Sequence, residues 1–287
     1  MAASQDQTPD RRIRNGAGLP LAHDSGFQNV TLGARSVEES QLVAVQVECV
    51  RLATGTASGT EGAAASRPSG GERVTALPAL EAYRLLAPEY DATPNALIAL
   101  EERMLRPLLP NLEGCTFIDV GTGTGRWAKY AASKGALAIG IDFCEEMLRA
   151  GGRQAVLGDA CRLPVADECA DVVICAFTLG YAPGCFSELR RITRVGGTVV
   201  VTDVHPGALE RGWKRSFRHS NSQIEIAHQL YTIRELHTQG LELTILAEPT
   251  LGPPEKAVFE QAGCPERFEE AARGPAIFVA LFRRTPL

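Results

Sequence analysis

The chain has 287 residues, 45% of them hydrophobic, which is enough apolar material for one full α/β core. Its net charge of −5 argues against a general nucleic-acid or membrane-surface binder. The eight cysteines form no Cys-x-x-Cys pair, the histidines lack metal-ligand spacing, and no apolar run reaches the ~20 residues of a spanning helix. We therefore expect a reduced, soluble, cytoplasmic protein without a metal site or a membrane partner.

Residues 1–75 are predicted to form an extension. Residues 1–19 are polar, and residues 54–71 are rich in Gly, Ala, Ser and Thr, as flexible linkers are. Alternating apolar residues suggest a strand within residues 42–52, although the same run could begin a helix. Such a strand could pair in dimerisation or serve as a lid; otherwise the extension is an appendage. We expect a monomer or a homodimer.

Residues 76–287 are predicted to form the folded domain, which begins with helices. Residues 80–87 and 95–109 carry apolar residues at three- and four-residue spacings, and Thr93-Pro94 is a favourable helix start. Tyr90 lies between the two helices. This segment is expected to cap the rest of the domain.

The rest of the domain is organised around residues 116–127. The β-branched and apolar residues 116–120 predict a buried strand, and residues 126–134 predict a helix. Three alternating glycines between them allow a tight turn: Gly121, Gly123 and Gly125. Backbone N–H groups at such a turn face a ligand above the strand.

The glycine spacing differs from the Gly-x-Gly-x-x-Gly of dinucleotide sites, and the Gly-Lys-Ser/Thr of phosphate loops is absent. Asp119, two residues before the first glycine, would also repel a phosphate. A ligand carrying an ammonium or a sulfonium fits this turn better.

Two further predicted strands also end in acidic residues. Residues 136–141 are followed by Asp142, about 20 residues beyond the glycine turn, where an acidic side chain typically holds ribose hydroxyls. Residues 154–157 are followed by Gly158 and Asp159. Each carboxylate could instead cap a turn or a helix start.

With these features the chain resembles the class I S-adenosylmethionine (SAM)-dependent methyltransferases, and specifically the small-molecule branch that includes the ubiquinone/menaquinone-biosynthesis methyltransferases. The segments that carry the resemblance are residues 118–126, 140–148, 158–164, 170–177 and 188–197. The resemblance implies SAM as the cofactor. It also implies an α/β, Rossmann-like, doubly wound sheet of seven strands, mostly parallel with an antiparallel last strand, plus an N-terminal helical cap.

The remaining strands of that sheet can be placed from their apolar runs. Residues 171–176, 198–202, 241–246 and 276–282 predict strands; residues 186–194 predict a helix that ends at 195–197. Right-handed crossovers put the carboxyl ends of the parallel strands at one edge. The loops expected around the site are residues 119–126, 142–147, 158–164, 177–186 and 203–218.

The resemblance assigns cofactor contacts to these loops. Asp119 and the backbone of Gly121, Thr122 and Gly123 are expected at the methionine end of SAM. Asp142 is expected to accept the ribose hydroxyls, with Phe143 and Met147 on either side of the adenine. Asp159 and the backbone of Ala160 are expected at the adenine amino group, and Phe177 is a further predicted cofactor contact.

His205 is the candidate general base, because it alone among the five histidines falls on a predicted site loop close to a strand end. Asp203 is a competing base or an orienting partner, and an acidic acceptor needs no base. Candidate substrate contacts are Tyr90, Tyr181, Trp213 and Arg215. The last two belong to the basic and aromatic segment 211–219, which could grip an anion or a planar ring, or could form a solvated lid hinge.

The predicted reaction is methyl transfer from SAM to an O or C atom of a small-molecule acceptor by in-line displacement. Alternatives are an RNA or protein methyltransferase and a catalytically inactive SAM-binding subunit. A cysteine-based mechanism, as in arsenic methyltransferases, would use the clustered cysteines Cys161, Cys169, Cys175 and Cys185. Residues 178–183 lack the His-Val pair frequent in quinone-pathway members, which puts a quinone substrate in doubt.

Overall fold

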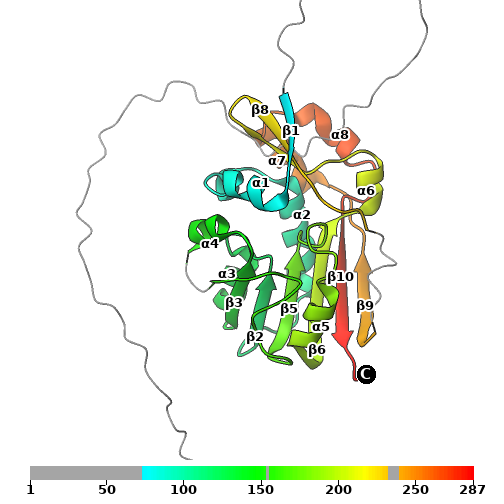
Figure 1. Cartoon of the computed structure of the whole chain (residues 1–287). Coiled ribbons are helices and arrows are strands. Elements are labelled where there is room, and N and C mark those ends of the chain that lie inside the picture. Colours follow the sequence, from blue (N-terminus) through cyan, green and yellow to red (C-terminus); the bar gives the residue numbers. More distant parts are fainter. Residues whose placement is uncertain (1–72, 153–154, 232–238) are drawn as a thin grey trace, which may run out of the picture. The chain divides into compact units, whose positions relative to one another are not determined.

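The computed structural model describes residues 73–152, 155–231 and 239–287, and the strand predicted within residues 42–52 lies outside them. A seven-stranded sheet forms the centre of the described domain (Figure 1), in the order β4-β3-β2-β5-β6-β10-β9. Its strands are β2 (Thr116–Val120), β3 (Leu137–Asp142), β4 (Ala155–Leu157), β5 (Ala170–Ala176), β6 (Thr193–Val204), β9 (Leu241–Ala247) and β10 (Ile277–Arg284). β10 pairs antiparallel with both β6 and β9, whereas β2 to β6 pair in parallel. The predicted mostly parallel sheet with an antiparallel last strand is confirmed.

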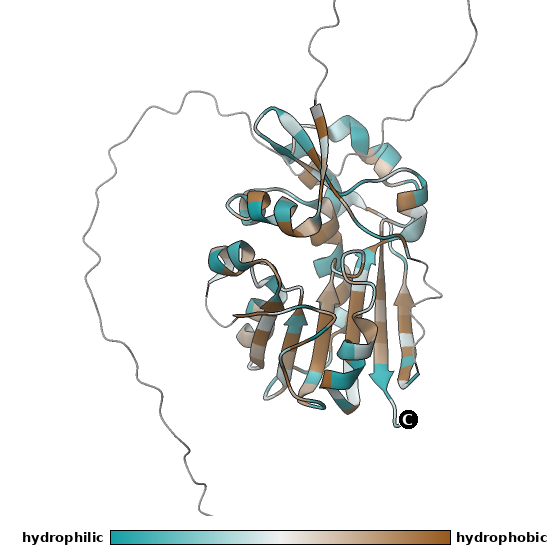
Figure 2. Cartoon of the chain, in the orientation of Figure 1, coloured by the Kyte–Doolittle hydropathy of each residue, from teal (hydrophilic) through white to brown (hydrophobic). Residues whose placement is uncertain are grey.

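Apolar side chains cover both faces of this sheet, as its continuous apolar strands require. Because successive residues of a strand point to opposite faces, Val172 and Ile174 of β5 belong to one core cluster, and Val173 and Cys175 to the other. Figure 2 shows these central strands as mostly hydrophobic.

The described residues also form eight α-helices. They are α1 (Ala79–Leu86), α2 (Ala96–Leu105), α3 (Arg126–Ser133), α4 (Glu145–Gly151), α5 (Phe186–Ile192), α6 (Pro206–Glu210), α7 (Pro253–Gln261) and α8 (Phe268–Ala271). The second predicted helix begins slightly later than Thr93-Pro94, because the Asn95 side chain caps it, accepting from the backbone N–H groups of Leu97 and Ile98 at 3.0 and 3.3 Å. Among the described helices, none combines the length and the apolar character needed to cross a bilayer.

The end of α5 differs from the prediction. Residues 195–197 were expected to end this helix, but α5 stops at Ile192, and Thr193 is already extended (φ −79°, ψ 132°). Gly197 approaches β5 so closely that a Cβ there would lie 2.8 Å from the carbonyl oxygen of Asp171. Gly196 and Gly197 therefore belong to the start of β6 (Thr193–Val204), which is longer than the predicted strand of residues 198–202.

A second, three-stranded sheet was not predicted. It has the order β1-β8-β7, with β1 (Arg73–Leu77) parallel to β8 (Ser222–Ile226) and β7 (Ser216–His219) antiparallel to β8. β1 therefore crosses the predicted domain boundary after residue 75. A small core joins this sheet to α1: Ala82, Leu86, Phe217, Ile224 and Ile226. Together α1 and this sheet lie over the carboxyl ends of the parallel strands (Figure 1).

Candidate active site

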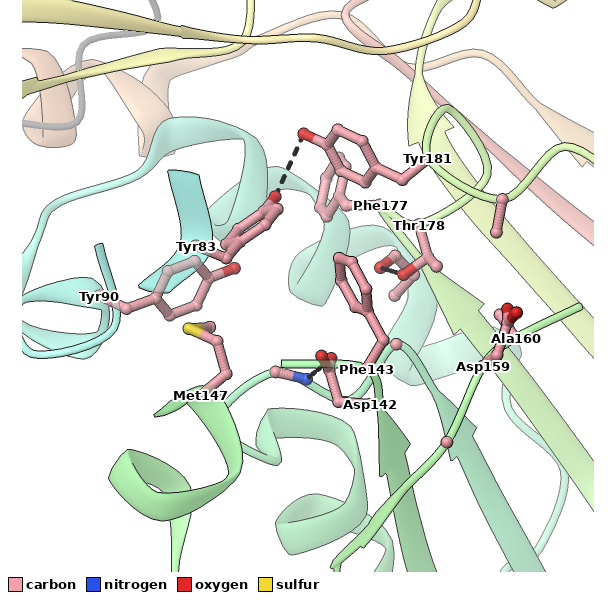
Figure 3. Close-up of a pocket in the computed structure, with 15 residues that line it drawn as sticks. Tyr83, Tyr90, Asp142, Phe143, Met147, Asp159, Ala160, Phe177, Thr178 and Tyr181 are labelled. Carbon is pink, nitrogen blue, oxygen red and sulfur yellow. Dashed lines mark hydrogen bonds between the residues drawn. The ribbon is translucent and has the colours of Figure 1, made fainter. Parts of the chain in front are cut away.

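A cavity opens at the carboxyl ends of β2, β3, β4 and β5, beneath α1 (Figure 3). It contains about 680 Å³ of empty space, including its open mouth. Its lining residues are Tyr83, Tyr90, Gly121, Gly123, Asp142, Phe143, Met147, Gly158, Asp159, Ala160, Ala176, Phe177, Thr178, Tyr181 and Ala182. Most of the predicted cofactor contacts are thus brought together in one place.

Gly121 shows why the turn after β2 requires glycine. Its φ is +71°, and a Cβ there would lie 2.0 Å from the Oγ1 of Thr178. The turn is fixed to the neighbouring strand because the N–H groups of Gly121 and Thr122 donate to the carbonyl of Ile141 at 2.8 and 3.0 Å. The backbone of the turn can therefore approach a ligand closely.

Asp142 ends β3 at the floor of the cavity. One carboxylate oxygen accepts from the N–H of Gly123 at 2.8 Å, and the other accepts from the N–H of Cys144 at 2.9 Å. Burial raises the pKa of Asp142, while those backbone donors oppose the rise. Phe143 and Met147 extend into the cavity above it (Figure 3), so a carboxylate and two apolar side chains border the same space.

Asp159 and Ala160 form another wall of the cavity, after β4. One oxygen of Asp159 accepts from the N–H of Cys161 at 2.8 Å, so this carboxylate also closes its own turn. A carboxylate and a turn backbone thus border the same cavity as Phe143 and Met147.

Asp119 and Thr122 lie beneath the glycine turn and are not among the residues that line this cavity. One oxygen of Asp119 accepts from the Thr122 hydroxyl at 2.7 Å and from the N–H of Ala128 at 3.0 Å. Burial raises the pKa of Asp119 to about 6. The carboxylate therefore holds the turn and the start of α3 together.

The residues between α1 and α2 are tied to the glycine turn. The Thr124 hydroxyl donates to Asp91 at 2.6 Å, which fixes the segment carrying Tyr90 above the cavity. Glu101 of α2 is fully buried and accepts hydrogen bonds from Arg126, Trp127 and Thr202. The helical cap is therefore anchored to the sheet by polar contacts as well as by packing.

A second cavity, with about 700 Å³ of empty space including its mouth, lies between the cap, β6 and the small sheet. It shares four aromatic residues with the first: Tyr83, Tyr90, Phe177 and Tyr181. The rest of its lining is Leu86, Asn95, Leu97, Val204, Leu209, Trp213, Lys214, Arg215, Ser216, Phe217 and Ile226. The two cavities meet at an aromatic partition.

The predicted substrate contacts all line a cavity, but Arg215 is not free to grip an anion. Its guanidinium pairs with Asp203 and donates to the carbonyl of Phe177 at 3.2 Å. Asp203 is fully buried and accepts from the N–H of Gly180 at 3.1 Å. The pair therefore holds the loop after β5 against β7.

His205 lines neither cavity. Its Nδ1 accepts from the N–H of Gly207 at 3.0 Å, capping α6, and its Nε2 lies 2.7 Å from a carboxylate oxygen of Glu248. The four clustered cysteines are also absent from both linings. The structure thus brings together the predicted substrate contacts and most of the predicted cofactor contacts around the two cavities, but neither Asp119, Thr122 nor His205 lines them.

Tyr83 and Thr178 line the first cavity and were not predicted. Tyr83 comes from α1, where its spacing indicated only an apolar helix face. Thr178 follows Phe177, a non-glycine residue with a positive φ of +53°. Such a backbone conformation often marks a functional turn, but it cannot be recognised from the sequence.

The first cavity fits the chemistry of SAM. Asp142 offers a buried carboxylate to hydroxyl groups, Phe143 and Met147 offer apolar faces to a planar base, and the glycine turn leaves room for close backbone approach.

Comparisons with known proteins agree with this assignment. Residues 118–201 match the family described as a methyltransferase domain. A demethylmenaquinone methyltransferase from Roseiflexus sp. (strain RS-1) is 38% identical over 139 residues, which are 42% of this chain and 58% of the relative. A malonyl-[acyl-carrier protein] O-methyltransferase from Pectobacterium atrosepticum is 31% identical over 125 residues, 40% of this chain and 49% of the relative. The matches thus span less than two thirds of these curated relatives.

A crystal structure of a SAM-dependent methyltransferase from Mesorhizobium loti superimposes with a TM-score of 0.52 at 20% identity, covering 66% of this chain and all of the other. At that identity the likeness concerns the fold. Residues 118–201 are thus similar to a methyltransferase domain, the fold is that of SAM-dependent methyltransferases, and the matched part of the chain resembles demethylmenaquinone methyltransferases.

Proposed function

We propose that this protein transfers a methyl group from SAM to an oxygen or carbon atom of a small-molecule acceptor. The observation that carries the proposal is the aromatic partition of Tyr83, Tyr90, Phe177 and Tyr181, which lines both cavities. A cofactor in the first cavity and an acceptor in the second would face each other across it. Holding two reactants in this way supplies much of the rate enhancement of a displacement reaction.

The first cavity would hold SAM through the groups already described. Asp142 would accept the ribose hydroxyls, Phe143 and Met147 would flank the adenine, and Asp159 would accept from its amino group. Asp119 would act on the methionine end from beneath the glycine turn. When bound, SAM supplies an electrophilic methyl group on a sulfonium.

The second cavity supports a small acceptor over RNA or protein. Most of its lining is apolar or aromatic, and the cations of the basic segment have partners within the chain. Arg215 pairs with Asp203, Lys214 with Glu225 at 2.8 Å, and Arg211 donates to the carbonyl of Pro275 at 2.8 Å. An acceptor with a large apolar surface suits such a lining.

General base catalysis by His205 or Asp203 stays a prediction, and the contacts of both side chains do not favour it. Burial raises the pKa of Tyr83 well above its ordinary value and that of Tyr90 to about 12, so both phenols stay protonated at neutral pH. We propose that the acceptor is either acidic itself or nucleophilic without deprotonation.

The proposal is tested by transfer of a radiolabelled methyl group from SAM to panels of phenols, carboxylic acids and quinols, with product detection by mass spectrometry. Transfer to at least one small acceptor, slowed in Asp142→Ala at low SAM concentration, is the expected result. Tight binding of SAM with transfer only to RNA or protein would contradict it.

A further inference from the structure

Two phenol hydroxyls meet at the partition between the cavities. Tyr83 of α1 and Tyr181 of the loop after β5 are 98 positions apart, and their hydroxyl oxygens lie 3.2 Å apart (Figure 3). Their rings pack edge to face with centroids 5.5 Å apart. Both residues line both cavities, so the pair lies where a methyl donor and its acceptor would meet.

Only one of the two hydroxyl protons of this pair takes part in the hydrogen bond between Tyr83 and Tyr181. Each hydroxyl carries one donor, and a single hydrogen bond between the two consumes only one of them, whichever hydroxyl donates. Residues 73–152, 155–231 and 239–287 provide no further acceptor for the second proton. Both residues are only partly buried, so water accepts this proton in the free protein. A ligand that displaces this water without supplying an acceptor leaves the donor unpaired and binds more weakly than one that supplies an acceptor.

Arg215 holds this donor in place. Its guanidinium lies 4.8 Å from the centroid of the Tyr181 ring, and the same side chain donates to the carbonyl of Phe177 and pairs with Asp203. Phe177 itself has a left-handed φ of +53°, a conformation that persists in a bulky residue only where the surroundings enforce it. The loop that presents Tyr181 is therefore pre-organised.

Three of the other polar side chains that line the second cavity have partners: Asn95 caps α2, Lys214 pairs with Glu225, and Ser216 accepts from Gln223. The Nε of Arg215 has no hydrogen-bond partner among the described residues. Six apolar side chains line the second cavity around the partition: Leu86, Leu97, Val204, Leu209, Phe217 and Ile226. In an apolar pocket, one placed polar group discriminates strongly between ligands that satisfy it and ligands that leave it unpaired.

We infer that the Tyr83–Tyr181 pair donates one hydrogen bond to an oxygen atom of an otherwise apolar acceptor, at or beside the atom that is methylated. The inference rests on the proposed function, in which the second cavity holds the acceptor. Tyr83 and Tyr181 are then specificity-determining residues: they select oxygen-bearing aromatic compounds over hydrocarbons of the same shape.

The test measures binding rather than turnover. The full chain, saturated with S-adenosylhomocysteine, is dialysed to equilibrium against naphthalene, 1-naphthol or 1-methoxynaphthalene. Both oxygen-bearing probes should bind about five- to tenfold more tightly than naphthalene, because each offers a lone pair to the donor. 1-Methoxynaphthalene has no hydroxyl proton to donate. Tighter binding of this probe than of naphthalene therefore reports a hydrogen bond donated by the protein.

Tyr83→Phe/Tyr181→Phe removes both hydroxyls and keeps both rings. This double variant should bind all three probes with the affinity that the wild type has for naphthalene, and the single variants show which hydroxyl faces the ligand. Tyr130→Phe, which alters a tyrosine outside both linings, should retain the preference.

Equal affinity of the wild type for the three probes, or a preference that survives in the double variant, would overturn the inference while S-adenosylhomocysteine still binds. A chain that fails to bind S-adenosylhomocysteine at all would overturn the proposed function instead, so the two failures are distinguishable.

Discussion

Arg215 and Asp203 form an ion pair that is almost sealed from solvent, with exposed side-chain fractions of 9% and 0%. Asp203 is the penultimate residue of β6, and Arg215 directly precedes β7 of the small sheet. The pair also binds the loop after β5, through the N–H of Gly180 and the carbonyl of Phe177. One buried pair thus joins the seven-stranded sheet, the loop after β5 and the small sheet.

Removing one partner of that pair should destabilise the protein strongly. Arg215→Met or Asp203→Asn leaves the other group buried without its partner, which costs about 3–5 kcal/mol of the free energy of unfolding. Urea unfolding followed by far-UV circular dichroism measures the loss. The matched control is Lys214→Met, because Lys214 pairs with Glu225 with 57% of its side chain exposed, and exposed pairs contribute about 1 kcal/mol or less. If Lys214→Met lowered the free energy of unfolding as much as Arg215→Met, the buried pair would contribute no more to stability than the exposed one.

Gly121→Ala and Gly114→Ala separate backbone strain from steric contact. Both glycines have φ +71°, but a Cβ at Gly114 has nothing within 4 Å, whereas one at Gly121 collides with Thr178. Gly114→Ala should cost about 1–2 kcal/mol of stability from the left-handed backbone alone. Gly121→Ala should cost about 1–3 kcal/mol more and weaken SAM binding. Indistinguishable unfolding midpoints for the two variants would argue against the close packing of the turn on Thr178.

Asp119 should make the cofactor-free protein less stable as pH rises. Its pKa is raised from 3.8 in the unfolded chain to about 6 in the folded chain, so the folded state holds the proton more tightly. The stabilisation is fully present below pH 3.8 and is lost as pH rises through 6.

Relative to Asp119→Asn, the wild type should therefore lose about 2–3 kcal/mol of unfolding free energy between pH 4 and pH 7. Urea titrations of both proteins at half-unit pH steps measure this difference. Parallel curves for the two proteins would contradict the raised pKa.

Asp142→Ala should weaken binding of SAM by about 1–3 kcal/mol, because the ribose hydroxyls lose a charged hydrogen-bond acceptor. Isothermal titration calorimetry of the two proteins gives the difference directly. Asp167→Ala is the control, since Asp167 is 74% exposed and pairs with Arg191 outside the cavity. If the Asp142 variant bound SAM as tightly as the control, the cofactor assignment of the first cavity would be wrong.

Deletion of residues 1–70 should leave a folded domain that binds SAM. The described structure starts with β1 at Arg73, which pairs with β8 over its full length and must be retained. Thermal unfolding and cofactor titration of the truncated and full-length proteins provide the comparison. A truncated chain that precipitates or loses cofactor affinity would show that the N-terminal residues belong to the fold or the site.

The central sheet could be predicted because its inner strands are buried on both faces and therefore read as largely continuous apolar runs, as in β5. The positions of Asp142 and Asp159 in the first cavity could be predicted from this sheet, because parallel strands bring their carboxyl ends to one edge.

The small sheet could not be predicted in the same way. β7 and β8 are short and mix polar with apolar residues, and β1 finds its parallel partner about 150 positions along the chain, at Ser222. Tyr83 was missed because only the packing of α1 over the sheet turns it toward the cavity. His205 was placed by its nearness to a strand end, but the helix that follows takes up its side chain as a cap.

The most direct test of this account is calorimetric titration of the purified full chain with SAM and, separately, with S-adenosylhomocysteine. One site per chain and micromolar binding of both are expected, since the carboxylate, the glycine turn and the apolar walls of the first cavity would contact parts that the two molecules share. Absence of heat and of binding for both molecules would contradict it.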